Sequence, residues 1–254
     1  VVVTVNANPT ISGNAPICAG STLQLTGSGT PDGTTPWTSS NTAVATISNT
    51  GLVSAVSAGS TTITYLDANG CQITAVVTVN AAPTISGNAP VCVGLTLQLT
   101  GSGTPDGTTP WTSSASGIAT VSNTGLVTGV SAGSTTITYT DDNGCQATVV
   151  VTVNATPTIS GNAPVCIGST LQLTGSGTPD GTTPWSSSVP GVATISNTGL
   201  VTGLGAGTTT ITYTTSSGCQ NTVVVTVNDN PTISGNAPIC DGATLQLTGS
   251  GTPD

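Results

Sequence analysis

The sequence contains no lysine, arginine, histidine, methionine or phenylalanine, and its nine acidic residues are all aspartates. Since nucleic acids and anionic lipids are bound mainly through Lys and Arg, the chain is not expected to bind nucleic acid. Long apolar runs are also missing. Runs such as Ala75-Val76-Val77-Thr78-Val79 are far shorter than the roughly 20 residues of a membrane-spanning helix. The composition therefore predicts no membrane insertion in this segment.

Catalytic groups are scarce as well. Nucleophilic catalysis needs a base beside a Ser, Thr or Cys, but His and Lys are absent. Hydrolysis by two carboxylates is also disfavoured, because the aspartates are spread along the chain in turn-forming contexts. We therefore expect no enzyme activity and no cofactor.

One aspartate recurs after Thr-Pro, at Asp32, Asp106, Asp180 and Asp254. Calcium prefers several oxygen ligands, whereas each of these positions brings a single carboxylate, and Asp-Gly is itself a turn-forming pair. A second acidic cluster, Asp141-Asp142-Asn143-Gly144, is replaced by Thr215-Ser216-Ser217-Gly218 further along the chain. The pattern favours turns and predicts no metal site.

What the chain does contain is a repeat. Trp37, Trp111 and Trp185 are evenly spaced (111 − 37 = 74), and one set of cysteines keeps the same step. Such a period indicates a tandem array of small domains. We assign residues 1–6 to the last strand of a preceding repeat, 7–80, 81–154 and 155–228 to three full repeats, and 229–254 to the first two strands of a further repeat.

Within each repeat, short segments alternate apolar and polar residues. Thr96-Leu97-Gln98-Leu99-Thr100 and Thr136-Ile137-Thr138-Tyr139 are examples. This period of two predicts β-strands, and Pro-Asp-Gly and Asn-Thr-Gly turn signals lie between them. About seven strands fit in one repeat, and no helical period is present. The predicted fold is all-β, with tandem two-sheet antiparallel β-sandwiches.

Several motifs of the second repeat carry a family resemblance. Trp111-Thr112-Ser113-Ser114, Gly125-Leu126-Val127-Thr128-Gly129 and Ala132-Gly133-Ser134-Thr135-Thr136-Ile137-Thr138 resemble the bacterial immunoglobulin-like domain, group 2, and the match recurs in all three full repeats. The cysteine motifs are similar to repeats in very large surface and adhesin proteins of the Bacteroidetes. The resemblance implies an immunoglobulin-like sandwich that acts as a spacer in adhesins and surface filaments, without shared catalytic residues.

The aromatic residues allow two interpretations. An exposed Trp can stack on a sugar, but Trp37, Trp111 and Trp185 each follow Thr-Thr-Pro at the expected start of the third strand. An immunoglobulin-like sandwich buries its Trp there, so core packing is favoured. Thr-rich strands are also typical of ice-binding faces, although here they alternate with loops.

The seven cysteines indicate disulfides and an oxidising, extracellular location, and no Cys-x-x-Cys pair suggests zinc. Pairing within a repeat would join Cys18 to Cys71, Cys92 to Cys145 and Cys166 to Cys219, leaving Cys240. In an alternating sandwich, however, the two cysteines of one repeat lie at opposite ends, too far apart for a disulfide. Pairing across joints would instead join Cys18 to Cys145 and Cys92 to Cys219. Both schemes, and other arrangements, stay open at this point.

The expected function is structural. We expect an extracellular repeat protein that forms a stalk, fibre or filament on or outside a bacterial cell, with self-association as its main partnership. The alternative is an adhesin module that recognises glycans or surfaces through variable loops. Fold analogy alone does not decide between them.

Overall fold

The computed structural model describes residues 1–250 of the chain. Asp254 and the end of the predicted segment 229–254 therefore lie outside the described residues. The chain divides into two compact units. Val1–Val153 holds the first two repeats, and Asn154–Asp254 holds the third repeat and the segment after it. In the described part the elements are all strands and no helix could cross a membrane.

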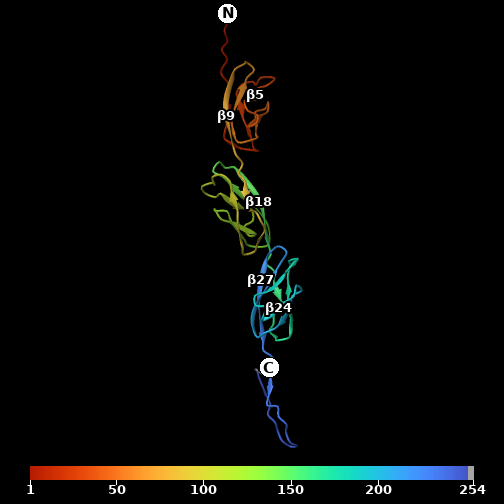
Figure 1. Ribbon diagram of the computed structural model, residues 1–254. Coiled ribbons are helices and arrows are strands. Elements are labelled where there is room, and N and C mark those ends of the chain that lie inside the picture. Colours follow the sequence, from red (N-terminus) through yellow and green to blue (C-terminus); the bar gives the residue numbers. More distant parts are fainter. Residues whose placement is uncertain (251–254) are drawn as a thin grey trace. The chain divides into compact units, whose positions relative to one another are not determined.

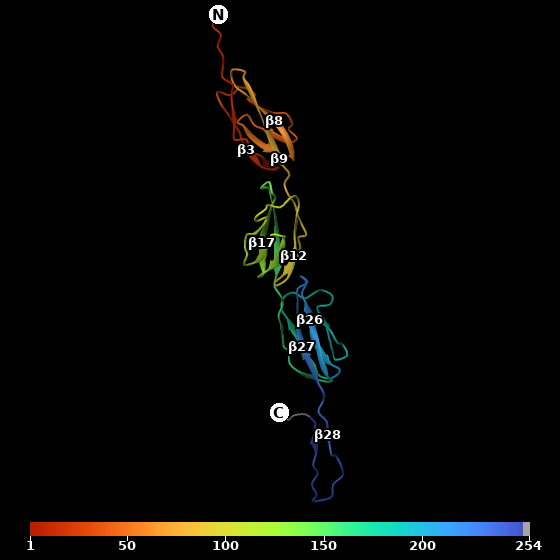
Figure 2. The same cartoon turned by 90° about the vertical axis from the view of Figure 1, so that its left-hand side faces the viewer.

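Nine short strands recur in each repeat, and Figures 1 and 2 show them from two directions. Repeat 1 contains β1 (Ile11–Ser12), β2 (Ile17–Cys18), β3 (Thr22–Gln24), β4 (Thr26–Gly27), β5 (Trp37–Ser39), β6 (Ala45–Ile47), β7 (Leu52–Ala55), β8 (Gly59–Leu66) and β9 (Gln72–Asn80). Repeat 2 contains β10 (Ile85–Ser86), β11 (Val91–Cys92), β12 (Thr96–Gln98), β13 (Thr100–Gly101), β14 (Trp111–Ser113), β15 (Ala119–Val121), β16 (Leu126–Gly129), β17 (Gly133–Thr140) and β18 (Gln146–Asn154). Repeat 3 contains β19 (Ile159–Ser160), β20 (Val165–Cys166), β21 (Thr170–Gln172), β22 (Thr174–Gly175), β23 (Trp185–Ser187), β24 (Ala193–Ile195), β25 (Leu200–Gly203), β26 (Gly207–Thr214) and β27 (Gln220–Asn228).

The strands of repeat 1 form two main sheets, with the orders β2-β9-β8-β5 and β3-β7-β6. A short ladder, β1-β4, extends the second sheet, because β4 continues β3 after Leu25. β1 and β2 are likewise two halves of one segment. Counted this way, the nine strands correspond to the expected seven, and the predicted all-β immunoglobulin-like sandwich is confirmed.

One pairing differs from the expected antiparallel arrangement. β2 runs parallel to β9, with Ile17 opposite Val79, whereas the other pairings of repeat 1 are antiparallel. The cause lies between β1 and β2, where Gly13 has a φ of 86° and Pro16 fixes its own φ. The chain bends there and moves from the edge of one sheet to the edge of the other.

The core of each repeat lies between its two sheets. In β8 the side chains of Thr61, Ile63 and Tyr65 point inward, as do those of Val77 and Val79 in β9. This alternation is the period of two that the sequence displays. The same positions are buried in the other repeats.

The two ends of the described chain contain few strands. Residues 1–6 form no strand. At the other end, β28 (Ile233–Ser234) pairs with β29 (Thr248–Gly249) and reproduces only the β1-β4 ladder. The residues of this segment that the structure describes are exposed, since no second sheet covers them.

Candidate functional site

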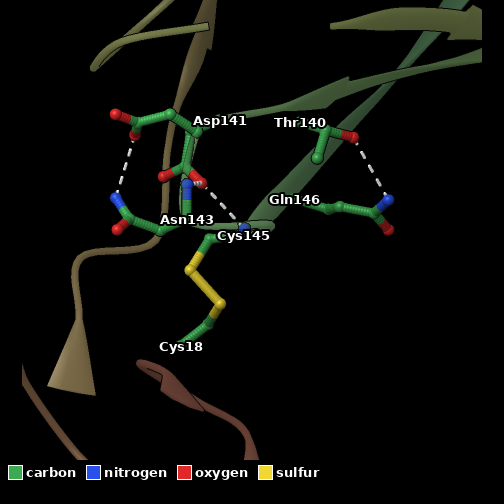
Figure 3. The surroundings of a disulfide bond; sticks show 7 residues. Cys18, Thr140, Asp141, Asn143, Cys145 and Gln146 are labelled. Atoms are coloured by element: carbon green, nitrogen blue, oxygen red, sulfur yellow. Dashed lines mark hydrogen bonds between the residues drawn. A yellow bond between two sulfur atoms is a disulfide. The ribbon is translucent and has the colours of Figure 1, made fainter. Parts of the chain in front are cut away.

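A disulfide between Cys18 and Cys145 links the first two repeats. Its sulfur atoms are 1.97 Å apart, and the two Cα atoms are 5.6 Å apart, which lies in the usual range. Cys18 ends β2, and Cys145 immediately precedes β18 (Figure 3). This is the pairing across a joint, and Cys71 carries a free thiol. The pairing of Cys18 with Cys71 is therefore not found.

A buried aspartate shapes the loop that presents Cys145. Asp141 is only 5% exposed, and its carboxylate accepts hydrogen bonds from the backbone N–H groups of Asn143 at 3.0 Å and Cys145 at 2.8 Å (Figure 3). The loop also closes through the backbone, since the N–H of Asp141 donates to the carbonyl of Cys145 at 2.9 Å. These bonds hold the loop in the conformation that presents the Cys145 side chain to Cys18.

The Cys18 side of the joint is a tight turn. The N–H of Ala19 donates to the carbonyl of Asn80 at 2.9 Å, which ties the turn to the end of β9. Gly20 has a φ of 86°, and its N–H donates to the carbonyl of Ala55 at 3.0 Å. Such a positive φ suits glycine. The turn therefore holds Cys18 at the same end of the repeat as the last residues of β9.

The other cysteines fall into two groups. Cys92 and Cys219 are also disulfide-bonded, and their pairing with each other stays a prediction. Cys71 and Cys166 are partly exposed free thiols, and Cys240 is a fully exposed one. Cys71 occupies the position in its repeat that Cys145 occupies in the next, with the same carboxylate contact, because Asp67 accepts from the N–H of Cys71 at 2.8 Å.

Asp141 is a residue whose role the sequence did not reveal. The acidic cluster varies between repeats, and its residue types predict only a turn. The Asp of repeats 1 and 2 becomes Thr215 in repeat 3, and its hydroxyl donates to the carbonyl of Cys219 at 3.1 Å. In all three repeats, therefore, the residue four positions before Cys71, Cys145 or Cys219 uses its side chain to hydrogen-bond the backbone of that cysteine.

The recurring Thr-Pro-Asp motifs are turns held by one carboxylate oxygen. Oδ1 of Asp32 accepts from the backbone N–H groups of Thr34 at 3.0 Å and Thr35 at 2.9 Å, and from the Thr34 hydroxyl at 2.7 Å. These bonds, above all the one from the Thr35 N–H, lower the pKa of the Asp32 carboxyl. Asp106 and Asp180 make the same contacts. Within residues 1–250 no three His, Cys or Asp side chains group together as metal ligands would.

The tryptophans lie in the core. Trp37, Trp111 and Trp185 are each 6 or 7% exposed and open the strands β5, β14 and β23. Each packs on the tyrosine opposite it in the sheet, with ring centroids 4.5 to 4.7 Å apart. Their indole faces are covered, so a sugar could not stack on them as on an exposed platform.

Comparison with known proteins gives one curated relative and several distant structures. The chain is 34% identical over 282 residues to ice-binding protein 1 of Shewanella frigidimarina (strain NCIMB 400); the match covers 94% of this chain but 31% of that protein. Domains 4 and 5 of the S-layer protein SbsC match at 22% identity and a TM-score of 0.27, over 58% of this chain and 98% of that one. An intimin mutant of EHEC O157:H7 matches at 22% identity and a TM-score of 0.26, and the match covers 32% of this chain and 50% of that one. Structural scores this low support no inference about this chain.

The family comparison covers nearly the whole sequence. The bacterial Ig-like domain (group 2) matches three times in succession, at residues 2–79, 75–153 and 149–227. These three matches coincide with the three copies of the nine-strand pattern. The chain therefore belongs to the family of bacterial Ig-like domains, group 2.

Proposed function

We propose that this chain is a structural spacer of an extracellular bacterial stalk or filament, in a large surface protein of the kind found in the Bacteroidetes. The observation that carries the proposal is the disulfide between Cys18 and Cys145, which crosses the joint between two repeats. A cross-link at a joint limits hinge motion, a property that suits a spacer. Disulfides persist in oxidising surroundings, which supports a location outside the cytoplasm.

The surface chemistry supports self-association of such spacers. With no cation and a formal charge of −9, the chain cannot form salt bridges between copies through its side chains. Lateral contacts must then use hydrogen bonds and apolar groups, which salt weakens little. Filaments seen in electron micrographs should therefore persist in high salt. If the purified chain stays monomeric by light scattering at every concentration, the self-association hypothesis is wrong, and the role as a stalk is not affected.

The role of the joint can be tested by small-angle scattering. The variant Cys18→Ser with Cys145→Ser should have a smaller radius of gyration than the wild type, because a joint without a cross-link samples bent arrangements. Cys166→Ser is the matched control, since Cys166 is a free thiol, and it should leave the radius unchanged. An equal radius in the double variant and the wild type would show that the disulfide does not stiffen the joint.

A second candidate is attachment to ice, which the name of the 34% identical relative suggests. The outer face of each four-stranded sheet carries cross-strand rows of hydroxyl side chains, such as Thr38, Thr64 and Thr74 in repeat 1. Since the chain spans 31% of that relative, the ice-binding part of the relative can lie elsewhere in it. Thermal hysteresis measured on this chain alone decides the matter, with Thr64→Val and Thr138→Val as the variants that should lower it.

A further inference from the structure

Each of the three repeats contains a pocket of the same construction. The pockets have volumes of about 320, 330 and 270 Å³ in repeats 1, 2 and 3. They open between the loop that precedes the Trp strand and the loop that precedes β7, β16 or β25. The pocket of repeat 1 is lined by Gln24, Leu25, Thr26, Gly27, Pro31, Trp37, Asn49, Thr50 and Tyr65.

The lining residues do not vary. The equivalents of all nine residues line the pockets of repeats 2 and 3 with identical side chains. Other loops do vary, as Asn41-Thr42-Ala43-Val44 becomes Ala115-Ser116-Gly117-Ile118 in repeat 2. Thr26, Asn49 and Thr50 are exposed, so their side chains are accessible at the rim of the pocket.

A tyrosine lines each pocket. Tyr65 is 1% exposed and Tyr139 is 2% exposed, and neither hydroxyl makes a hydrogen bond to the described residues. Yet no fully buried polar side-chain atom is left unsatisfied in that part of the chain. Each hydroxyl therefore keeps a small contact with solvent, and each tyrosine is among the residues that line the pocket of its own repeat. In repeat 3 the hydroxyl of Tyr213 makes one long bond, 3.4 Å, to the carbonyl of Gly177.

The position of the tyrosine ring is set by a glycine. A Cβ atom at Gly27 would lie 2.4 Å from Cζ of Tyr65, so any side chain there would collide with the ring. Burial, together with the charge of Asp67, raises the pKa of Tyr65. The hydroxyl therefore keeps its proton near neutral pH and can donate as well as accept.

The rim adds neutral acceptors. The Gln24 amide donates to the backbone carbonyls of Leu25 at 2.7 Å and Thr50 at 2.8 Å, so its orientation is fixed and its Oε1 is left as an acceptor. Asn49 donates to the carbonyl of Thr34 at 3.2 Å, which leaves its Oδ1 in the same role. No charged side chain lines any of the three pockets.

We propose that each pocket binds one residue of a neutral sugar, so that the chain carries three equivalent saccharide sites. A neutral sugar ring offers hydroxyl groups to fixed acceptors and to a hydroxyl donor, and apolar C–H groups to the edge of the Trp ring. An anionic ligand would meet a rim of acceptors without a cation. The volumes lie at the small end of the range for ligand sites, which suits one ring.

The saccharide site does not depend on the spacer role. It lies in a different part of the fold from the one expected to recognise glycans. The sequence suggested variable loops for an adhesin module, whereas the pockets lie in loops that are identical in every repeat. Three equal weak sites in one chain strengthen binding to a polysaccharide when several can engage at once. A polymer should therefore bind more tightly than its monosaccharide.

The test uses the three tryptophans, since every Trp of the chain lines a pocket. Glucose, galactose, mannose and N-acetylglucosamine are titrated while intrinsic fluorescence is recorded. At least one should change the emission with a Kd of about 1 mM, a weak single-site affinity. The variant Tyr65→Phe, Tyr139→Phe, Tyr213→Phe keeps the rings and should bind roughly three- to tenfold more weakly, the usual effect of one hydrogen bond.

The matched control is Thr10→Ala, Thr84→Ala, Thr158→Ala, which removes three exposed hydroxyls that lie outside the pockets and should leave the Kd unchanged. Absence of any fluorescence change with all four sugars up to about 100 mM, far above that weak affinity, would overturn the proposal. So would an unchanged Kd in the Tyr variant, or an equal loss in both variants. Circular dichroism spectra establish that each variant is folded.

Discussion

Trp37 packs against Tyr65 at a ring-centroid distance of 4.6 Å, and the two residues face each other across β5 and β8. The pair lies where the core of the repeat meets its invariant loops. Gly27 approaches the tyrosine ring on one side, and Gly51 lies near the tryptophan. Two aromatic rings and two glycines therefore form one packed group. Substitutions in this group should change the free energy of unfolding.

Gly101→Ala, at the position of Gly27 in repeat 2, should destabilise that repeat. The new Cβ would lie 2.5 Å from the ring of Tyr139, and the ring would have to move. We expect the free energy of unfolding to fall by about 1–3 kcal/mol, the cost of overpacking a core. Gly107→Ala is the control, since nothing lies within 4 Å of its Cβ position; it should change stability by less than about 0.5 kcal/mol. Denaturant unfolding followed by fluorescence measures both, and equal values would contradict the packing argument.

A peptide map should show Cys92 joined to Cys219. Trypsin cannot digest the chain, which has no Lys or Arg, but cleavage before aspartate separates the cysteines usefully. Four of the resulting peptides matter here: Cys18 lies in 1–31, Cys71 and Cys92 lie in 67–105, Cys145 and Cys166 lie in 142–179, and Cys219 lies in 180–228. Mass spectrometry should find 1–31 linked to 142–179, and 67–105 linked to 180–228. A link between 1–31 and 67–105 would instead be the pairing within a repeat.

Acid should weaken the Thr-Pro-Asp turns. Hydrogen bonds, with those from the Thr35, Thr109 and Thr183 N–H groups foremost, lower the pKa of Asp32, Asp106 and Asp180 in the folded chain. A carboxyl with a lowered folded pKa stabilises the fold above its unfolded pKa of about 3.9. This stabilisation is lost as the pH falls from there through the folded pKa. The Tm of the wild type should therefore drop more steeply below about pH 4 than that of the variant with Asn at all three positions. Parallel curves, recorded by circular dichroism, would argue against it.

Calcium should not bind to these turns. The Oδ1 atom of Asp106 already accepts three hydrogen bonds from Thr108 and Thr109, and a cation would have to displace them. Calorimetric titration with calcium should give no stoichiometric heat, and a chelator should leave the Tm unchanged. A fall of several degrees on adding chelator would mean that a bound ion stabilises the fold.

The parts of the fold that were predictable rest on local signals. The period of two in Thr136-Ile137-Thr138-Tyr139 predicted a β-strand, and these residues lie in β17, where Ile137 and Tyr139 are buried. Pro-Asp-Gly predicted the turn at Asp106. The parallel pairing of β2 with β9 was missed, although Gly13 and Pro16 mark the bend. Local residues indicate that a strand breaks, but the sheet that its second half joins depends on contacts far along the chain.

Some features of the candidate sites could be predicted from the sequence, and others could not. Strand direction places Cys18 and Cys71 at opposite ends of one sandwich, so the sequence could argue for a bond across the joint. The buried carboxylate of Asp141 could not be foreseen, because a loop aspartate usually faces water. The three pockets were equally hidden, since their residues come from four segments and one of them, Trp37, was predicted to pack in the core.

The disulfide at the first joint also determines how this chain would respond to a pull on its ends. Cys18 and Cys145 are 127 residues apart in sequence, so tension that enters at Val1 crosses directly from one sulfur to the other. The strands from β3 to β17 lie outside that path and carry no tension while the bond is intact. In the variant Cys92→Ser with Cys219→Ser, reducing the bond between Cys18 and Cys145 would let force unfold the whole loop and add at most roughly 430 Å of extended chain, at about 3.4 Å per residue. Single-molecule stretching of that variant with and without a reductant should therefore differ by an extension of up to that size. The bond at the joint would thus protect the repeats from being unfolded by force, although it lies outside their cores.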